Sequence, residues 1–131
     1  VLSMIQYALG GIGAISLVVG GIGIANVMML TVNERVREIG VMKALGATMM
    51  DIRVSYLLEA GMLGVASSAI GIMAGVAISS AIGSLAGLPS SVTLSSIFIG
   101  LIFGVLTTTL AGLYPANKAA RLDPIVALHT E

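Results

Sequence analysis

Charged residues are confined to short segments of the chain, and long apolar stretches separate them. Residues 1–33 contain no charged side chain, and neither do residues 60–117. Each stretch exceeds the roughly 20 apolar residues that a helix needs to cross a hydrocarbon core. The first has room for one span and the second for two. We therefore predict membrane-spanning helices at about 8–30, 50–82 and 94–113, the last ending at Tyr114-Pro115.

Residues 33–50 have the pattern of an amphipathic helix. At helical spacing, one broad side is apolar and the other carries most of the charges. Asn33 is a good N-cap, and Gly46 stands where a left-handed C-terminal cap is needed. We predict a helix at about 34–46, although a plain amphipathic helix on the membrane surface has the same pattern. Its apolar side holds Val36, Ile39, Val41, Met42 and Leu45, and its charges are Glu34, Arg35, Arg37, Glu38 and Lys43.

Charge pairs and cap signals support further details of these helices. Glu34 with Arg37, and Arg35 with Glu38, have the three-residue spacing of helix-stabilising ion pairs. Thr48 and Asp51 have the spacing of a capping box, which predicts the start of the second span. Asp123-Pro124 reads as an N-cap followed by a proline, which predicts a short helix through His129. Residues 83–96, rich in Gly, Pro and Ser, are predicted to form the turn before the third span.

The composition places the chain in a bilayer. Hydrophobic residues make up 57% of the chain and charged residues 9%, whereas about a quarter of the residues of a soluble domain are charged. The expected fold is therefore an all-α membrane protein with three spans, one amphipathic helix and a short C-terminal helix. A formal net charge of zero without a basic tract argues against a nucleic-acid partner. The lack of cysteine excludes disulfides and thiolate chemistry.

The positions of the basic residues predict the orientation. All six Lys and Arg residues lie within 35–53 or 118–121. Three spans place these two segments on the same side, and the positive-inside rule makes that side cytoplasmic. Residues 33–50 and the C-terminus are then cytoplasmic and the N-terminus is outside. Because a chain that starts outside without a targeting sequence is unusual, we expect a further span to precede this segment.

Small residues along the spans predict close helix packing. Two GGIG repeats and two GxxxG motifs lie in apolar sequence, which favours contacts between membrane helices. Neither GGIG continues as a phosphate-binding loop. The residues predicted to mediate packing are Gly13, Ser16, Gly20, Gly71, Gly75, Gly100 and Gly104.

The residue types needed for catalysis or metal binding are scarce. His129 is the one histidine, and both aspartates, Asp51 and Asp123, fall at the predicted cytoplasmic margin. We therefore predict no catalytic residue, no metal site and no cofactor in this chain. Glu59 is the acid that lies nearest the apolar interior. It needs either a partner or access to interfacial water.

Three segments together resemble a known family. NERVREIGVMKALGAT at 33–48, DIRVSYLLEAGMLGVASSAIGIMAG at 51–75 and YPANKAARLDPIVAL at 114–128 resemble the C-terminal transmembrane region of MacB/FtsX-type ABC transporter permeases. The resemblance implies a four-helix permease of the prokaryotic cytoplasmic membrane, whose first span and extracytoplasmic domain precede this segment. It also implies a dimer, or a pseudo-dimer of two permeases, driven by a cytoplasmic ABC ATPase that binds ATP and Mg²⁺.

The resemblance also assigns roles to residues. It implies that Glu34, Arg35, Arg37, Glu38, Ile39 and Lys43 belong to a coupling helix that docks on the ATPase, with the tail from Arg121 beside it. His129 departs from the family, which usually has a basic residue there. The expected function is to transmit ATP-driven motion across the membrane for export or extraction of a substrate. A force-transmitting scaffold acting on an outer enzyme and a small oligomeric pore-former are the alternatives, and the sequence does not reveal the cargo.

Overall fold

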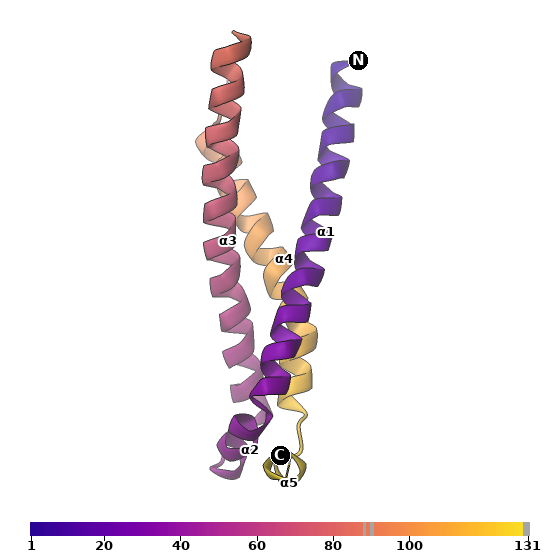
Figure 1. Cartoon of the computed structure of the whole chain (residues 1–131), viewed down its shortest axis with the longest axis vertical. Helices are drawn as coiled ribbons and strands as arrows, with labels where there is room; N and C mark the ends of the chain where they lie inside the picture. The colour runs from indigo at the N-terminus through magenta and orange to yellow at the C-terminus, as the bar shows by residue number, and fades with distance from the viewer. Residues whose placement is uncertain (88, 90, 130–131) are drawn as a thin grey trace.

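The computed structural model describes residues 1–87, 89 and 91–129, and its regular elements in those residues are all helices (Figure 1). Three of them are long and apolar enough to cross a membrane, which confirms the predicted all-α fold with three spans. Part of the predicted 83–96 turn lies outside the described residues. The helices are α1 (Leu2–Glu34), α2 (Val36–Ala44), α3 (Met49–Ala86), α4 (Leu94–Ala120) and α5 (Pro124–Leu128).

Three of the predicted helix ends are confirmed. The Thr48 hydroxyl accepts a hydrogen bond from the Asp51 amide, and the Asp51 carboxylate accepts one from the Thr48 amide, so α3 begins with a complete capping box. The Asp123 carboxylate caps α5 by accepting from the Ile125 amide at 2.9 Å. Gly46 adopts a φ of 105° directly after α2, as a left-handed cap requires.

Two other predicted ends are wrong, and burial explains both. Asn33 caps no helix, because α1 continues through Glu34 and only Arg35 interrupts the path into α2. Val32 is fully buried there, which holds the last turn of α1 in place. The helix of the third span, α4, does not end at Tyr114-Pro115 either. It runs on to Ala120 because Pro115 and three following alanines are buried, and alanine is the best helix former.

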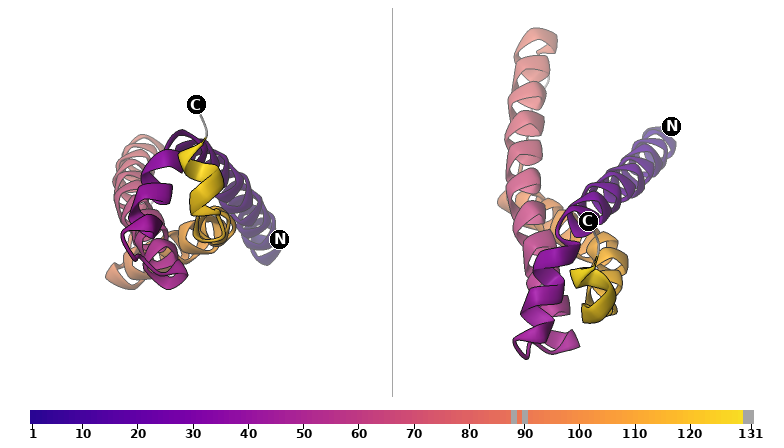
Figure 2. Two further views of the ribbon diagram at one scale, coloured as in Figure 1. Left: turned by 90° about the horizontal axis from the view of Figure 1, so that it is seen from below. Right: turned by 60° about the horizontal axis from the view of Figure 1, so that its bottom comes forward.

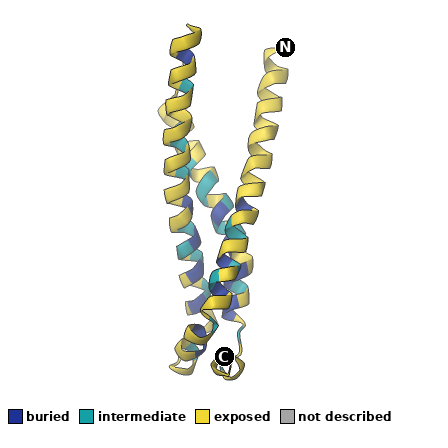
Figure 3. Ribbon diagram, viewed as in Figure 1, coloured by how far each residue is buried: buried dark blue, intermediate teal, exposed yellow. Residues whose placement is uncertain are grey.

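The buried core lies at the end of the molecule that carries α2 and α5 (Figure 3). At the opposite end α1 diverges from α3, and α4 crosses between them (Figures 1 and 2). Within the most apolar windows of α1, α3 and α4, only 17%, 6% and 11% of the residues are buried. The rest of this apolar surface therefore needs lipid or other helices as its surroundings. The core consists of Met28, Val32, Ile39, Ile52, Tyr56, Ala60, Ala116, Ala119 and Ala120.

A regular antiparallel contact joins α3 to α4. Facing residues follow one another in steps of four along both helices, and at least one of each pair is small. A Cβ atom added to Gly112 would lie 2.5 Å from the Cβ of Ala60. Added atoms at Gly64 and Gly104 would also overlap the side chain opposite. The four pairs are Ala60–Gly112, Gly64–Thr108, Ser68–Gly104 and Ile72–Gly100, and we call them the α3–α4 zipper.

Only part of the predicted packing set acts within this chain. Gly100 and Gly104 belong to the zipper, but among the described residues no atom outside the local helix lies within 4 Å of a Cβ added to Gly13, Gly20, Gly71 or Gly75. These four glycines therefore contact no other helix of the described chain, and their role in helix packing stays a prediction. Helix α1 instead meets α4 at Gly21, where an added Cβ would lie 3.4 Å from Cγ2 of Thr107.

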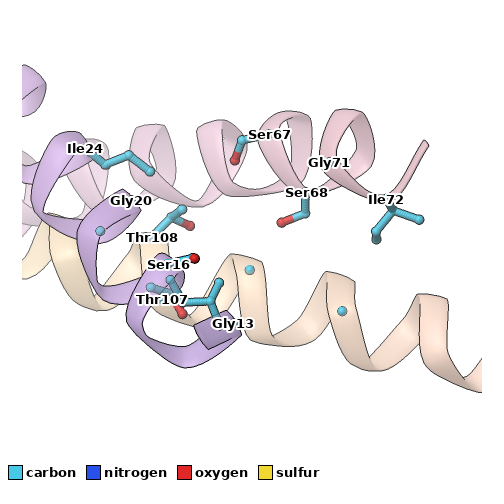
Figure 4. Close-up of a pocket in the computed structure, with 14 residues that line it drawn as sticks. Gly13, Ser16, Gly20, Ile24, Ser67, Ser68, Gly71, Ile72, Thr107 and Thr108 are labelled. Carbon is cyan, nitrogen blue, oxygen red and sulfur yellow. The ribbon is translucent and has the colours of Figure 1, made fainter. Parts of the chain in front are cut away.

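Several of these open positions line a cavity of about 410 Å³ between α1, α3 and α4 (Figure 4). Most of its hydroxyl groups donate hydrogen bonds to backbone carbonyls of the same helix. Ser16 donates to the carbonyl of Ile12 at 2.9 Å, and Thr107 donates to that of Phe103 at 2.7 Å. Ser67 and Thr108 bond back in the same way. The cavity wall is therefore mostly apolar in character despite its hydroxyl content.

Candidate functional site

The first feature of the site is a group of exposed charges at the α1–α2 junction. Glu34, Arg35, Arg37 and Glu38 are all exposed. Arg35 Nε lies 3.9 Å from Glu38 Oε2, with the two side chains 52% and 71% exposed, so this predicted pair is a weak, solvated one. The predicted Glu34–Arg37 ion pair does not form among the described residues. These four side chains therefore form an open surface of mixed charge.

The second feature is an apolar surface at the far end of α2. Val41 and Met42 are exposed, and Leu45 is 84% exposed. We call these three residues the apolar tip. Of the five residues predicted on the apolar side, these three are exposed within the described chain. The buried stripe instead contains Ile39 and Gly40, because it follows the contact with α5.

Gly40 makes that contact possible. A Cβ atom added to Gly40 would lie only 2.7 Å from the Cβ of Ala127 in α5, closer than real side chains approach. Ala127 itself is buried. Helices α2 and α5 consequently lie side by side below the bundle (Figure 2).

Lys43 makes a second connection, and unlike the other four charges of this segment it points inward. The ammonium group is part-buried and donates to the carbonyl of Leu122 at 2.6 Å and to that of Ala120. These carbonyls lie at the C-terminal end of α4, where helices leave acceptors unpaired and carry partial negative charge. A hydrogen bond to a charged group contributes about 1.5–3 kcal/mol. Lys43 therefore fastens α2 to the end of α4.

The turn from α2 into α3 is also well defined. The Gly46 amide donates to the Lys43 carbonyl and the Ala47 amide donates to the Met42 carbonyl, each at 3.0 Å. This pair of hydrogen bonds is a Schellman motif. It ends α2 shortly before the Thr48 capping box begins α3. Local hydrogen bonds therefore fix the turn that carries Leu45 of the apolar tip.

Glu59 stands apart from this site. Its side chain is half-buried and borders a shallow pocket with Ser55, Leu58 and Met62. It has no hydrogen bond or ion pair among the described residues, so the described part of the chain supplies no buried partner for it. No group of three metal-ligating side chains occurs in those residues either.

Three spans with an amphipathic helix between the first and second define a multi-pass membrane domain, and the comparisons identify its family. Residues 10–124 match the family described as FtsX-like permease C-terminal. The chain belongs to this family, which confirms the resemblance seen in the sequence. It is a permease domain of the ABC transporter class.

Individual relatives cover most or all of the chain. It is 40% identical over its whole length to the Uncharacterized ABC transporter permease YknZ of Bacillus subtilis, and spans 33% of that protein. It is 44% identical over 97% of its length to the Pyoverdine export ATP-binding/permease protein PvdT of Pseudomonas syringae pv. tomato, spanning 19% of it. Identity is 43% over 97% of the chain to the Macrolide export ATP-binding/permease protein MacB of Bdellovibrio bacteriovorus, of which it spans 20%. The chain thus spans a third or less of these relatives.

Sequence reasoning missed the inward roles of Gly40 and Lys43. One signal was available for the glycine. A glycine inside an otherwise regular helix often marks a close approach of another segment. The lysine offered no such signal, because its acceptors are backbone carbonyls far away in the sequence.

Proposed function

We propose that this domain receives motion from a cytoplasmic ABC ATPase through α2 and transmits it across the membrane to export or extract a substrate. The observation that carries the proposal is that α2 presents exposed charges and an apolar tip while its other side is fastened to the spans. The names of the PvdT and MacB relatives combine export, ATP binding and permease. ATP and Mg²⁺ would be bound by the ATPase, since this sequence contains no phosphate-binding loop.

The surface is suited to a protein partner of complementary charge. Arginine is enriched at protein interfaces, and complementary charges speed and orient docking. The exposed apolar tip supplies surface that a partner can bury. Ile39 and Lys43 lie inward, so the proposed docking set narrows to Glu34, Arg35, Arg37, Glu38, Val41, Met42 and Leu45.

The proposed orientation follows from charge. Every Lys and Arg residue lies in the segments 35–53 and 118–121. Helix α2 lies in the first segment and α5 follows the second, and these two helices pack together. The positive-inside rule places that end in the cytoplasm, where an ABC ATPase would reach α2.

A dimer of two such permeases belongs to the same proposal. The Gly13 and Gly20 positions on α1, and Gly71 and Gly75 on α3, have open space beside them. Small residues on membrane helices allow another helix to approach closely. The exposed apolar surface of the spans leaves room for such contacts.

Replacing Arg35, Arg37 and Glu38 together by alanine tests the docking surface. In the full transporter reconstituted with its ATPase, we expect the amount of substrate moved per ATP hydrolysed to fall by about tenfold or more, since several interfacial charges are lost. Membrane insertion should be unchanged. Lys118→Ala, which removes an exposed cation on α4, is the matched control. Unchanged coupling in the triple variant would refute docking at this surface, and ATP hydrolysis without any cargo movement in the unaltered transporter would favour the scaffold alternative.

A further inference from the structure

We infer that α2, α5 and the C-terminal end of α4 form one rigid unit, so that a push on α2 displaces α4, with Lys43 as the positioning residue. We call this unit the α2–α5–α4 strut. The inference rests on the proposed function, because it specifies which helix receives the motion.

The strut has two attachments on one side of α2. Gly40 and Lys43 are three residues apart, which places them on the same helix face. Gly40 lies against Ala127, and Lys43 binds the carbonyls of Ala120 and Leu122. Ala120 and Ala127 are buried. One attachment is therefore apolar contact and the other is a charged group bonded to the end of a helix, and together they resist both separation and rotation.

Helix α4 is well placed to distribute the motion. It packs against both α3 and α1, and Figure 2 shows it crossing between them. At Gly112 an added Cβ would meet Ala60 of α3 and Met28 of α1 at once. A displacement of α4 therefore also displaces α1 and α3 at this crossing.

Helix α2 is joined to the other two spans, α1 and α3, by the connecting backbone. A single non-helical residue, Arg35, joins α2 to α1, and residues 45–48 join it to α3. Arg35 and Leu45, one in each connection, are exposed, and beyond the backbone only Ile39 of α2 joins the core that contains Val32 and Ile52. The 45–48 turn is held by its own hydrogen bonds, so the Arg35 junction is the one that can bend while the strut keeps its shape. We therefore expect the angle between α2 and α1 to change during the cycle, while the distance between α2 and α5 stays constant.

A disulfide between Gly40→Cys and Ala127→Cys tests the rigidity of the strut. The natural chain has no cysteine, so the pair is the only one present in this domain. The two Cβ atoms must move apart by about 1 Å to reach disulfide spacing, which the short α5 can accommodate. The whole transporter is reconstituted in proteoliposomes, and the pair is oxidised and then reduced. Equal transport per ATP in the oxidised and reduced states is the expected result. Transport that stops on oxidation and returns on reduction would overturn the inference, as would failure of the pair to oxidise.

Substitution of Lys43 tests its positioning role. Lys43→Met should lower transport per ATP by about tenfold or more, since both charge-assisted hydrogen bonds of Lys43 are lost, while ATP hydrolysis continues. Lys43→Arg should retain most of the coupling, and Lys118→Met should behave as the unaltered protein. The oxidised disulfide of the Gly40→Cys and Ala127→Cys pair should restore coupling to the Lys43→Met variant, which a role in folding alone does not predict. Full coupling in Lys43→Met, or no rescue by the disulfide, would count against the strut.

These results are separable from failure of the proposed function. If α2 receives no motion from an ATPase, the Arg35, Arg37 and Glu38 triple variant couples normally. If only the strut is wrong, that triple variant is uncoupled as expected while the disulfide blocks transport.

Discussion

At the scale of single residues, the role of a glycine depends on what faces it. The GxxxG motif at Gly100 and Gly104 correctly predicted close packing. The similar motif at Gly71 and Gly75 contacts no other helix among the described residues, because α3 meets α4 through a different stripe, spaced four apart from Ala60. That four-residue spacing was visible in the sequence. Choosing between two small-residue stripes on one helix required the position of α4.

Gly112 is the residue whose substitution should disturb the bundle most directly. Gly112→Val places a branched side chain where Ala60 and Met28 already lie. Overpacking of this kind costs about 1–3 kcal/mol, so the melting temperature of the detergent-solubilised protein should fall. Gly75→Val is the control, since open space surrounds that position. Equal melting temperatures for the two variants would contradict the crossing at Gly112.

At the scale of elements, local signals predicted helix ends well where the ends are exposed. The capping box at Thr48, the cap at Asp123 and the left-handed Gly46 all depend on nearby backbone groups. The ends predicted at Asn33 and Pro115 were wrong because the helices continue through both positions, where neighbouring residues are buried. Local pattern therefore determines exposed ends, and tertiary packing determines buried ones.

The cap of α3 gives a prediction at this scale. Thr48→Val keeps the shape of the side chain but removes the hydroxyl that accepts from the Asp51 amide. Loss of such a cap costs about 1 kcal/mol. We expect faster amide hydrogen exchange in the first turn of α3. The control is Thr31→Val, whose hydroxyl only bonds back within α1. The cap would have no role if exchange at residues 49–52 were the same in both variants.

At the scale of the whole molecule, the composition and charge pattern sufficed to predict three spans and an amphipathic helix. They could not predict how the helices are arranged, because apolar sequence fits many packings in lipid equally well. The divergence of α1 from α3 and the inward position of Lys43 depend on contacts between distant segments. These contacts, more than the charges themselves, connect the exposed surface of α2 to the spans.

Labelling of Leu45→Cys tests most directly that α2 is a cytoplasmic helix covered by an ATPase. Leu45 is 84% exposed at the apolar tip, and the natural chain has no competing cysteine. A membrane-impermeant maleimide should label it in inverted vesicles but not in intact cells, and the bound ATPase should protect it. Leu85→Cys, 89% exposed near the opposite end of α3, should show the reverse sidedness and no protection. Labelling of Leu45→Cys from outside intact cells, or labelling that the ATPase leaves unchanged, would contradict the account.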